Sequence, residues 1–186
     1  MARAGLDTDA VVGAAARLAD ADGLEAVTLA RLAAILGVRS PSLYAHVDGL
    51  ADLTRRLAVR GARELAAELQ QAVAGRSGSD ALGVLADAYR AYARAHRGTY
   101  AALQRAPARN DAEAAAAATA VVEVVLAVLR GYDVEGDDAI HATRIIRAAL
   151  HGFVTLETGG GFGIPLDLND SYARLVDVLD GGLSRA

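Results

Sequence analysis

The segment Thr28–Val47 constrains the fold most, because it predicts two short helices joined by a tight turn. Thr28 is a good N-cap, and the apolar residues that follow it recur at i, i+3, i+4 and i+7, which gives one inward-facing stripe. Gly37 ends this first helix, where a left-handed backbone costs glycine least. Ser40 followed by Pro41 predicts an N-cap with proline at the first helical position. A second helix is therefore expected to begin at Ser40.

The second helix is expected to have an inward and an outward face. Leu43 and Val47 lie four residues apart and are its inward anchors, which leaves other side chains available to face outward. Two short helices with this turn are typical of a helix-turn-helix that reads the major groove of DNA. Helix-terminal amides can hold phosphates, arginine can bind guanine or phosphate, and small side chains can touch base edges. The predicted DNA-binding residues are Thr28, Arg39, Ser40, Pro41, Ser42, Leu43, Tyr44 and His46.

Three motifs follow one another near the N-terminus. They are a first helix that ends in glycine, a threonine-capped second helix, and a run of the form G-V-x-x-x-x-[LIV]-Y-x-H-[FV]. Here they are Ala10–Gly23, Thr28–Leu36, and Gly37, Val38, Leu43, Tyr44, His46 and Val47. In these motifs the chain resembles the tetracycline-repressor (TetR) family of bacterial one-component regulators, over about the first 55 residues. It departs from the family at Leu50, where relatives usually have a lysine that contacts phosphate.

A second, shorter resemblance lies toward the C-terminus. Leu150, His151 and Gly152 are similar to the Trp-His-Gly motif of one ligand-domain subfamily, with Leu150 in place of the tryptophan. The family resemblance implies a helical body that binds a small-molecule effector and a homodimer with a four-helix bundle at its interface. It also implies a near-palindromic double-stranded DNA operator as partner. The helices predicted over 139–158 and 168–183 are the candidates for that interface.

Composition favours an all-α fold. The chain has 186 residues, of which 53% are hydrophobic and only 4% aromatic, and alanine and leucine dominate. The absence of cysteine excludes disulfides and cysteine zinc sites, and is consistent with a reducing cytoplasm. The first residues lack the apolar core of a signal peptide, and no long uncharged apolar run predicts a membrane span. We expect a cytoplasmic protein without a membrane partner.

The net charge of −4 argues against a nucleic-acid partner at first sight. Its distribution weakens that objection, because residues 1–65 contain eight arginines and eight acidic residues, so the acidic excess lies in the rest of the chain. All 19 basic residues are arginines, so any charged contact with DNA must come from a guanidinium group. Arg3 lies in an arm before the first helix and is an additional candidate for a minor-groove contact.

Helical periodicity and cap residues predict nine helices and no strand. Asp80 and Asp137 are expected to cap two of them, and Asn110 or Asp111 a third. A helix-turn-helix domain over 1–48 is expected to precede a ligand-binding and dimerisation domain over 49–186. The predicted helices are Thr8–Ala21, Thr28–Leu36, Ser40–Val47, 48–73, Ala81–His96, Thr99–Arg105, 111–131, Asp137–Thr158 and Leu168–Leu183.

The sequence contains no pattern of residues that is typical of a metal site or an enzyme active site. The four histidines show no i, i+4 pair, and the glycines at 159–161 follow no strand and precede no lysine, so neither a metal site nor a phosphate loop is predicted. The chain contains no G-x-S-x-G elbow. The sequence therefore predicts neither an enzyme nor a cofactor.

A small set of polar-tipped aromatic and charged residues stands out in an alanine, leucine and valine interior. Small-molecule sites are typically apolar cavities with a few convergent polar groups, which this set could supply. The alternative is structural: tyrosines at the edge of a core that point their hydroxyl groups to water, and a core histidine at position 151. The candidate ligand-binding residues are Tyr89, Tyr92, His96, Tyr100, His151, Phe153 and Glu157.

Taken together, these features predict a dimeric, ligand-responsive DNA-binding transcriptional regulator, most often a repressor in the family that the chain resembles. The acidic net charge and Leu50 keep one alternative open. That alternative is a helical small-molecule-binding protein that does not bind DNA.

Overall fold

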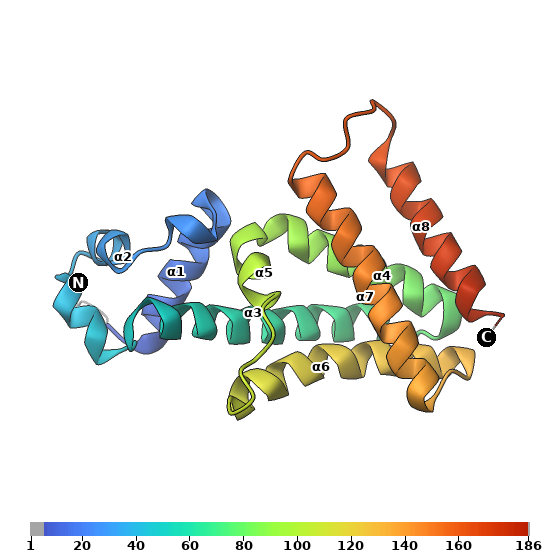
Figure 1. The fold of residues 1–186 in the computed structure, drawn as a ribbon, viewed down its shortest axis with the longest axis horizontal. Helices are drawn as coiled ribbons and strands as arrows, with labels where there is room; N and C mark the ends of the chain where they lie inside the picture. The colour runs from blue at the N-terminus through green and yellow to red at the C-terminus, as the bar shows by residue number, and fades with distance from the viewer. Residues whose placement is uncertain (1–5, 186) are drawn as a thin grey trace. The chain divides into compact units, whose positions relative to one another are not determined.

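The computed structural model describes residues 6–185, which form helices joined by turns and loops (Figure 1). Over those residues the eight α-helices are α1 (Thr8–Asp22), α2 (Leu29–Leu36), α3 (Gly49–Val73), α4 (Gly78–Ala95), α5 (Arg97–Leu103), α6 (Ala112–Leu129), α7 (Gly136–Thr158) and α8 (Leu168–Leu183). Three 3-10 segments accompany them, η1 (Leu24–Ala26), η2 (Ser40–Ala45) and η3 (Arg130–Tyr132). The predicted all-α fold is confirmed, and the third predicted helix is present as η2.

The chain forms two compact units, each built from two ranges of the sequence. The head unit contains the described residues up to Ala62 together with Ala95–Ala118, and the body unit contains Arg63–Arg94 together with the residues from Thr119 onward. Helices α3 and α6 contribute residues to both units. The expected functional boundary between residues 48 and 49 stays a prediction.

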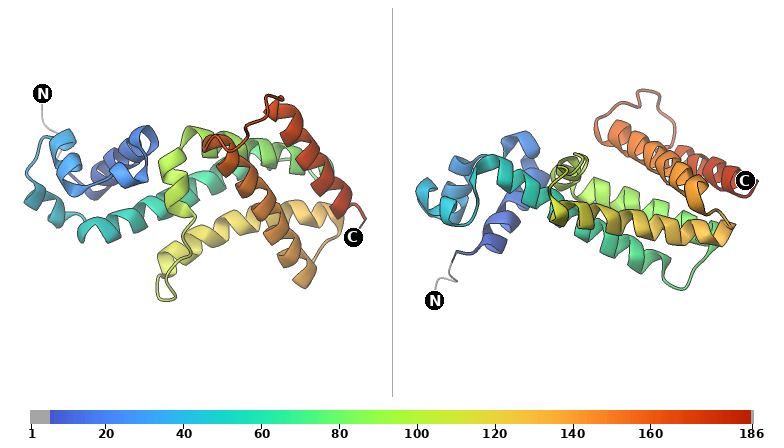
Figure 2. Two further views of the ribbon diagram at one scale, coloured as in Figure 1. Left: turned by 45° about the horizontal axis from the view of Figure 1, so that its top comes forward. Right: turned by 60° about the horizontal axis from the view of Figure 1, so that its bottom comes forward.

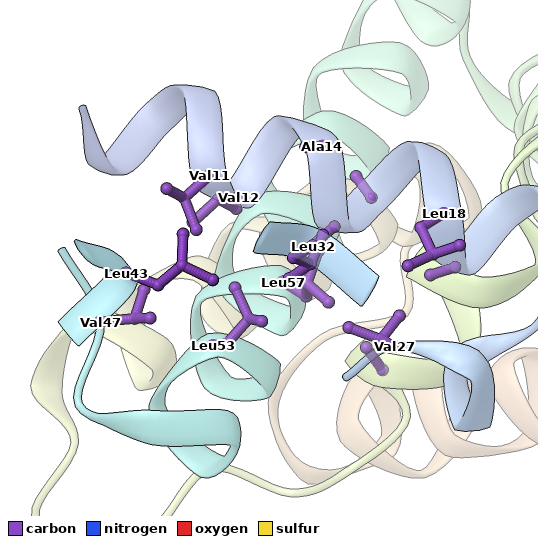
Figure 3. Packing of buried hydrophobic residues seen from close by; sticks show 14 of the residues in the cluster. Val11, Val12, Ala14, Leu18, Val27, Leu32, Leu43, Val47, Leu53 and Leu57 are labelled. Atoms are coloured by element: carbon purple, nitrogen blue, oxygen red, sulfur yellow. The ribbon is translucent and has the colours of Figure 1, made fainter. Parts of the chain in front are cut away.

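In the head unit, α1, α2, η2 and α3 surround one apolar cluster (Figure 3). Leu32 of α2, Leu43 of η2, and Leu53 and Leu57 of α3 are all fully buried. Burial of a leucine side chain contributes about 1.5–3 kcal/mol, so these residues hold the three segments together. Val11 of α1 is equally buried on the other side of the cluster.

Several helix ends are fixed by side-chain caps or lie where the sequence predicts them. An Asp7 carboxylate oxygen accepts the N–H of Ala10 at 2.7 Å and so caps α1. An Asp111 carboxylate oxygen accepts the N–H of Ala114 at 3.0 Å, which confirms Asp111 at the start of α6. The last helix spans Leu168–Leu183 as predicted. These short-range caps are local in sequence, which is why the sequence alone can predict them.

The predicted N-caps Asp80 and Asp137 are wrong, and α5 begins at Arg97 instead of Thr99. Helix α4 begins at Gly78, so Asp80 lies in its first turn instead of capping it. Helix α7 begins at Gly136 with Glu135 as N-cap, so Asp137 also lies in the first turn. Gly78 and Gly136 both have positive φ, a conformation that glycine adopts readily, and this turns the chain into each helix earlier than the acidic residues indicated.

In the body unit, α7 and α8 contact each other and are joined by a loop that extends beyond their ends (Figure 2). Ile146, Leu150 and Val154 of α7 are buried. Tyr172 of α8 is also buried, and its hydroxyl donates to the backbone carbonyl of Ala86 in α4 at 2.5 Å. The polar end of this tyrosine is therefore paired inside the core, as a buried hydroxyl requires.

Helix α5 approaches α1 unusually closely at one glycine. A Cβ atom added to Gly98 would lie 2.1 Å from the carbonyl oxygen of Ala19. No side chain fits at that position, so the absence of one at Gly98 lets the two helix backbones touch. By contrast, a Cβ atom added to Gly83 in α4 would meet no atom within 4 Å.

We expect the Gly98→Ala substitution to destabilise the protein by about 1–3 kcal/mol, because α5 must move away from α1 to accommodate the methyl group. Gly83→Ala is the matched control and should stabilise the protein by up to about 1 kcal/mol, since alanine is the better helix former. Urea unfolding followed by circular dichroism measures both. Equal stability of the two variants would contradict the close contact.

Candidate functional site

Helix α2 begins and ends as predicted. The Thr28 hydroxyl oxygen accepts the N–H of Arg31 at 3.2 Å and caps the helix. Gly37 has a φ of 67°, in the left-handed region, and its N–H bonds back to the carbonyl groups of Ala33 and Ala34. Both ends of the first helix of the motif are therefore fixed by local hydrogen bonds, and the chain turns into η2 at the predicted place.

The second helix of the motif differs from its prediction in two respects. It is a six-residue 3-10 segment, and its N-cap is Arg39, with Ser40 already inside it and no capping bond from a side chain. Pro41 lies in the first turn, where its missing N–H costs nothing. Leu43 and Val47 are buried at 0% and 2% exposure, which confirms them as the inward anchors. The expectation that Leu43 contacts DNA is wrong for the same reason, because its side chain packs in the core.

The other predicted DNA-binding residues remain at the surface of the head unit. Tyr44 is 59% exposed, which is high for an aromatic side chain. Ser40 and His46 are half-buried, and the backbone carbonyl of His46 accepts a hydrogen bond from the Thr8 hydroxyl of α1. Five of the eight predicted residues are therefore exposed, one at the start of α2 and four in η2 and its N-cap. The exposed residues are Thr28, Arg39, Pro41, Ser42 and Tyr44.

Several arginines of the head unit pair with nearby acidic groups. Arg31 pairs with Asp22 at 2.5 Å, and Arg56 pairs with Asp52 at 2.8 Å. Among the arginines described up to position 65, only Arg17 and Arg39 have neither an ion pair nor a hydrogen bond. Arg39 is the one that adjoins η2, and Arg3 lies outside the described residues. Arg39, whose guanidinium group is unpaired, is therefore the N-cap of the segment that carries the exposed Tyr44.

The body unit contains a buried charged cluster centred on Arg90 of α4. The Arg90 guanidinium donates to both carboxylate oxygens of Glu157 on α7, at 2.9 and 2.5 Å, and to the side-chain oxygen of Asn169 on α8 at 3.0 Å. It also lies 4.6 Å from the centre of the Tyr172 ring and 5.5 Å from that of Phe153. One cation therefore links α4, α7 and α8.

This pairing changes the titration of both partners. The hydrogen bond from Arg90 holds the pKa of Glu157 below its ordinary value of 4.5, against the opposing effect of burial. The hydrogen bond to Glu157 likewise raises the pKa of Arg90. Both groups are consequently charged at neutral pH. Arg90 is only 9% exposed, although helical periodicity puts it opposite the apolar stripe that contains Leu82 and Leu85 and so predicts a solvent-exposed arginine.

The candidate ligand-binding residues divide between the two units. Tyr89, Tyr92, His151, Phe153 and Glu157 belong to the body unit, whereas His96 and Tyr100 belong to the head unit. Phe153 and Glu157 meet at Arg90, so the structure brings those two together. The sequence reasoning missed Arg90, Asn169 and Tyr172 as their partners. One signal was available: a carboxylate at Glu157, on a helix with an apolar face, requires a partner when buried.

The remaining candidates have structural contacts of their own. The Tyr92 hydroxyl donates to Glu64 at 3.3 Å, and His96 Nδ1 lies 3.1 Å from the Asp20 carboxylate of α1. Tyr89 and Tyr100 are buried at 6% and 7% exposure. Burial, followed by the nearby charge of Arg147, lowers the pKa of His151 and favours its neutral form. Over residues 6–185 no group of three or more histidine or acidic side chains could hold a metal ion.

The fold and its exposed face define an all-helical protein with an N-terminal helix-turn-helix. The family model for the tetracyclin repressor-like, C-terminal domain matches residues 82–179, more than half of the chain. The chain is 37% identical over 181 residues to the uncharacterised HTH-type transcriptional regulator Rv0681 of Mycobacterium tuberculosis, covering 97% of this chain and 83% of that protein. It is 35% identical over 181 residues to the regulator YobS of Bacillus subtilis, covering 97% and 94%. The chain belongs to the TetR family of HTH-type transcriptional regulators, and is therefore not an enzyme.

Solved structures show the same fold at lower identity. A protein of unknown function from Rhodococcus sp. RHA1 superposes with a TM-score of 0.82 at 24% identity, covering 98% of this chain and 97% of that one. The TetR family protein ActR of Streptomyces coelicolor, in complex with (S)-DNPA, superposes with a TM-score of 0.71 at 18% identity, covering 98% of each chain. The shared fold extends over both units.

Helix α6, with η3, is the one described segment long and apolar enough to cross a membrane by length and composition. The window that meets this criterion is 28% buried. Val124, Val128 and Leu129 are buried, whereas many of the alanines are not. Most of the helix lies inside the region that matches the tetracyclin repressor-like C-terminal domain. Family membership therefore favours a helix of the regulatory domain.

We expect Glu157→Gln to destabilise the protein by about 3–5 kcal/mol at neutral pH, because it leaves the buried Arg90 cation without its counter-charge. The pKa of Glu157 is lower in the folded than in the unfolded chain, so the stabilisation is present above about pH 4.5 and is lost as pH falls through the folded pKa. The stability difference between wild type and variant should shrink accordingly below that pH. Glu135→Gln, at an exposed N-cap without a capping bond, is the matched control. A difference independent of pH would contradict the assignment.

Proposed function

We propose that this regulator is a homodimer that binds a near-palindromic operator and is released from it by a small molecule. The observation that carries the DNA-binding part is the face formed by Arg39 and Tyr44. It combines a free guanidinium group with an exposed aromatic hydroxyl on the second helix of the helix-turn-helix. The other arginines described nearby are largely paired within the protein, so this face concentrates the groups available to DNA.

Each residue of this face has a proposed role. The helix-terminal amides at Thr28 and Ser40 hold phosphates, because they lack partners within their helices. Arg39 binds guanine or phosphate, and Tyr44 and His46 add phosphate or base contacts. Pro41 and Ser42 touch thymine methyl groups or base edges. Leu43 positions the segment from inside the core.

Exposed apolar residues support the proposed dimer. Seven of the ten large hydrophobic side chains that are exposed in the described chain lie on α7, on α8 or in the loop between them. Ile145 of α7 is 61% exposed and Val178 of α8 is 71% exposed. Concentrated exposure of this kind marks interaction surfaces. In a dimer, the two recognition helices would reach successive major grooves about 34–36 Å apart.

The effector site is proposed in the ligand-binding domain over residues 49–186, around the aromatic set named above. ActR, a relative in fold, is described in complex with (S)-DNPA, which supports a ligand-binding role for this body. Within the set, Phe153 and Glu157 are the strongest members because they surround Arg90, and His151 and Gly152 retain part of the Trp-His-Gly pattern. A ligand that binds one arrangement of the heads better than another would shift the DNA equilibrium. The cytoplasm is the expected compartment.

We expect the Arg39→Ala and Tyr44→Ala double variant to lose about tenfold or more in DNA affinity, because each removed contact costs about 1–3 kcal/mol. Mobility-shift assays with the intergenic DNA that flanks the protein's own gene measure the loss. Arg130→Ala, an exposed arginine of η3 without a partner among the described residues, removes one charge elsewhere and should change affinity little. If folded wild-type protein shows no salt-sensitive, sequence-selective binding, the alternative of a small-molecule-binding protein without DNA-binding activity is the correct one.

We expect Ile145→Glu combined with Val178→Glu to convert the dimer into monomers, because each buried glutamate would lose hydration without gaining a partner. Light scattering coupled to size-exclusion chromatography gives the mass directly. Ala116→Glu and Ala127→Glu, at exposed positions of α6, form the control pair. A monomeric wild-type protein at micromolar concentration would contradict the proposed dimer.

A further inference from the structure

The head unit contains a cleft of about 770 Å³ that the proposed effector site does not use. It is bounded by the segment before α2, the first half of α3, α5 with the loop that follows it, and the start of α6. Its volume lies within the range of about 300–1,000 Å³ that is usual for small-molecule sites. None of the seven candidate ligand-binding residues lines it.

The cleft is mostly apolar. Val27, Leu50, Val59 and Leu103 line it together with small alanines, so few side chains project into the space. Val27 and Val59 are also buried, at 3% and 4% exposure, which fixes those parts of the wall. An apolar, largely pre-formed wall favours a ligand that buries apolar surface there.

The four charged side chains that line the cleft, Glu25, Arg55, Arg105 and Asp111, sum to no net charge. Arg55 lies 3.3 Å from the Asp111 carboxylate and 3.1 Å from that of Glu113, so its charge is already neutralised. Glu25 and Arg105 are exposed, opposite in sign and without partners among the described residues. A ligand with a net charge would therefore be attracted to one of them and repelled by the other.

We propose that this cleft binds a neutral, largely apolar small molecule. It is a second ligand site, separate from the residues around Arg90. Thr28 lines the cleft and also caps α2. If the proposed DNA contact at Thr28 holds, an occupied cleft and a bound phosphate compete for the same end of α2. Binding to the cleft itself does not depend on that role.

Two fluorescent probes of nearly equal shape test the site on the full-length protein without DNA. N-phenyl-1-naphthylamine is neutral, and 8-anilinonaphthalene-1-sulfonate carries the same rings with one negative charge. We expect saturable binding of the neutral probe, at least about tenfold tighter than that of the sulfonate, because desolvating a charge beside an apolar wall is costly. No saturable binding, or tighter binding of the sulfonate, would overturn the proposal.

Substitutions that fill the cleft with larger side chains test whether the probe binds there. Ala114 and Ala118 of α6 line the cleft one helical turn apart, so Ala114→Phe with Ala118→Phe should weaken binding by about tenfold or more. Ala112→Phe with Ala116→Phe has the same spacing on the same helix, at exposed positions outside the cleft, and should leave binding unchanged. Equal effects of the two pairs, or none from the first, would show that the probe binds elsewhere.

A second pair covers the case in which the phenylalanine variant does not fold. Leu50→Glu places a charge at an exposed position that lines the cleft. Ile35→Glu places the same charge at an exposed position of α2 that does not line the cleft. Only the first should weaken binding of the neutral probe. Because these measurements contain no DNA, their failure leaves the proposed operator binding untouched, and failure of operator binding leaves them valid.

Discussion

The apolar cluster of the head unit is the constraint on which the proposed DNA-binding surface depends. Segment η2 has only six residues and no side-chain capping bond, and a helix that short is not stable alone. It is held in place by the burial of Leu43 and Val47 against α1 and α3. The exposed Arg39 and Tyr44 are therefore positioned by their buried neighbours. A core substitution there would alter DNA recognition without touching DNA.

The carboxylate of Asp20 on α1 also binds the start of α5. Asp20 accepts the N–H of Thr99 at 2.8 Å and lies 3.1 Å from His96 Nδ1, at the end of α5 where unpaired N–H groups and the helix dipole favour a negative charge. Within the head unit, one carboxylate on α1 therefore fixes the start of α5.

Sequence reasoning succeeded where the determining interactions are local. The caps at Thr28 and Asp111, and the left-handed end of α2 at Gly37, depend on residues within four positions, so propensity and spacing predict them. It failed where distant residues decide. Arg90 and Glu157 are 67 positions apart, and helical periodicity alone predicted Arg90 in solvent. The cleft likewise depends on how four segments meet, which no single segment encodes.

A count of charged residues in the sequence also overestimates the number of cations that can contact DNA. Eight arginines and eight acidic residues up to position 65 describe a neutral region, yet several of those arginines are paired internally, so fewer cations are available to DNA than the count indicates. Phosphate contacts supply much of DNA affinity, and a single face with one free guanidinium group contributes few of them. In the proposed homodimer that number doubles without an added residue. Under that proposal, the apolar surface of α7 and α8 is as much a requirement for operator binding as Arg39 itself.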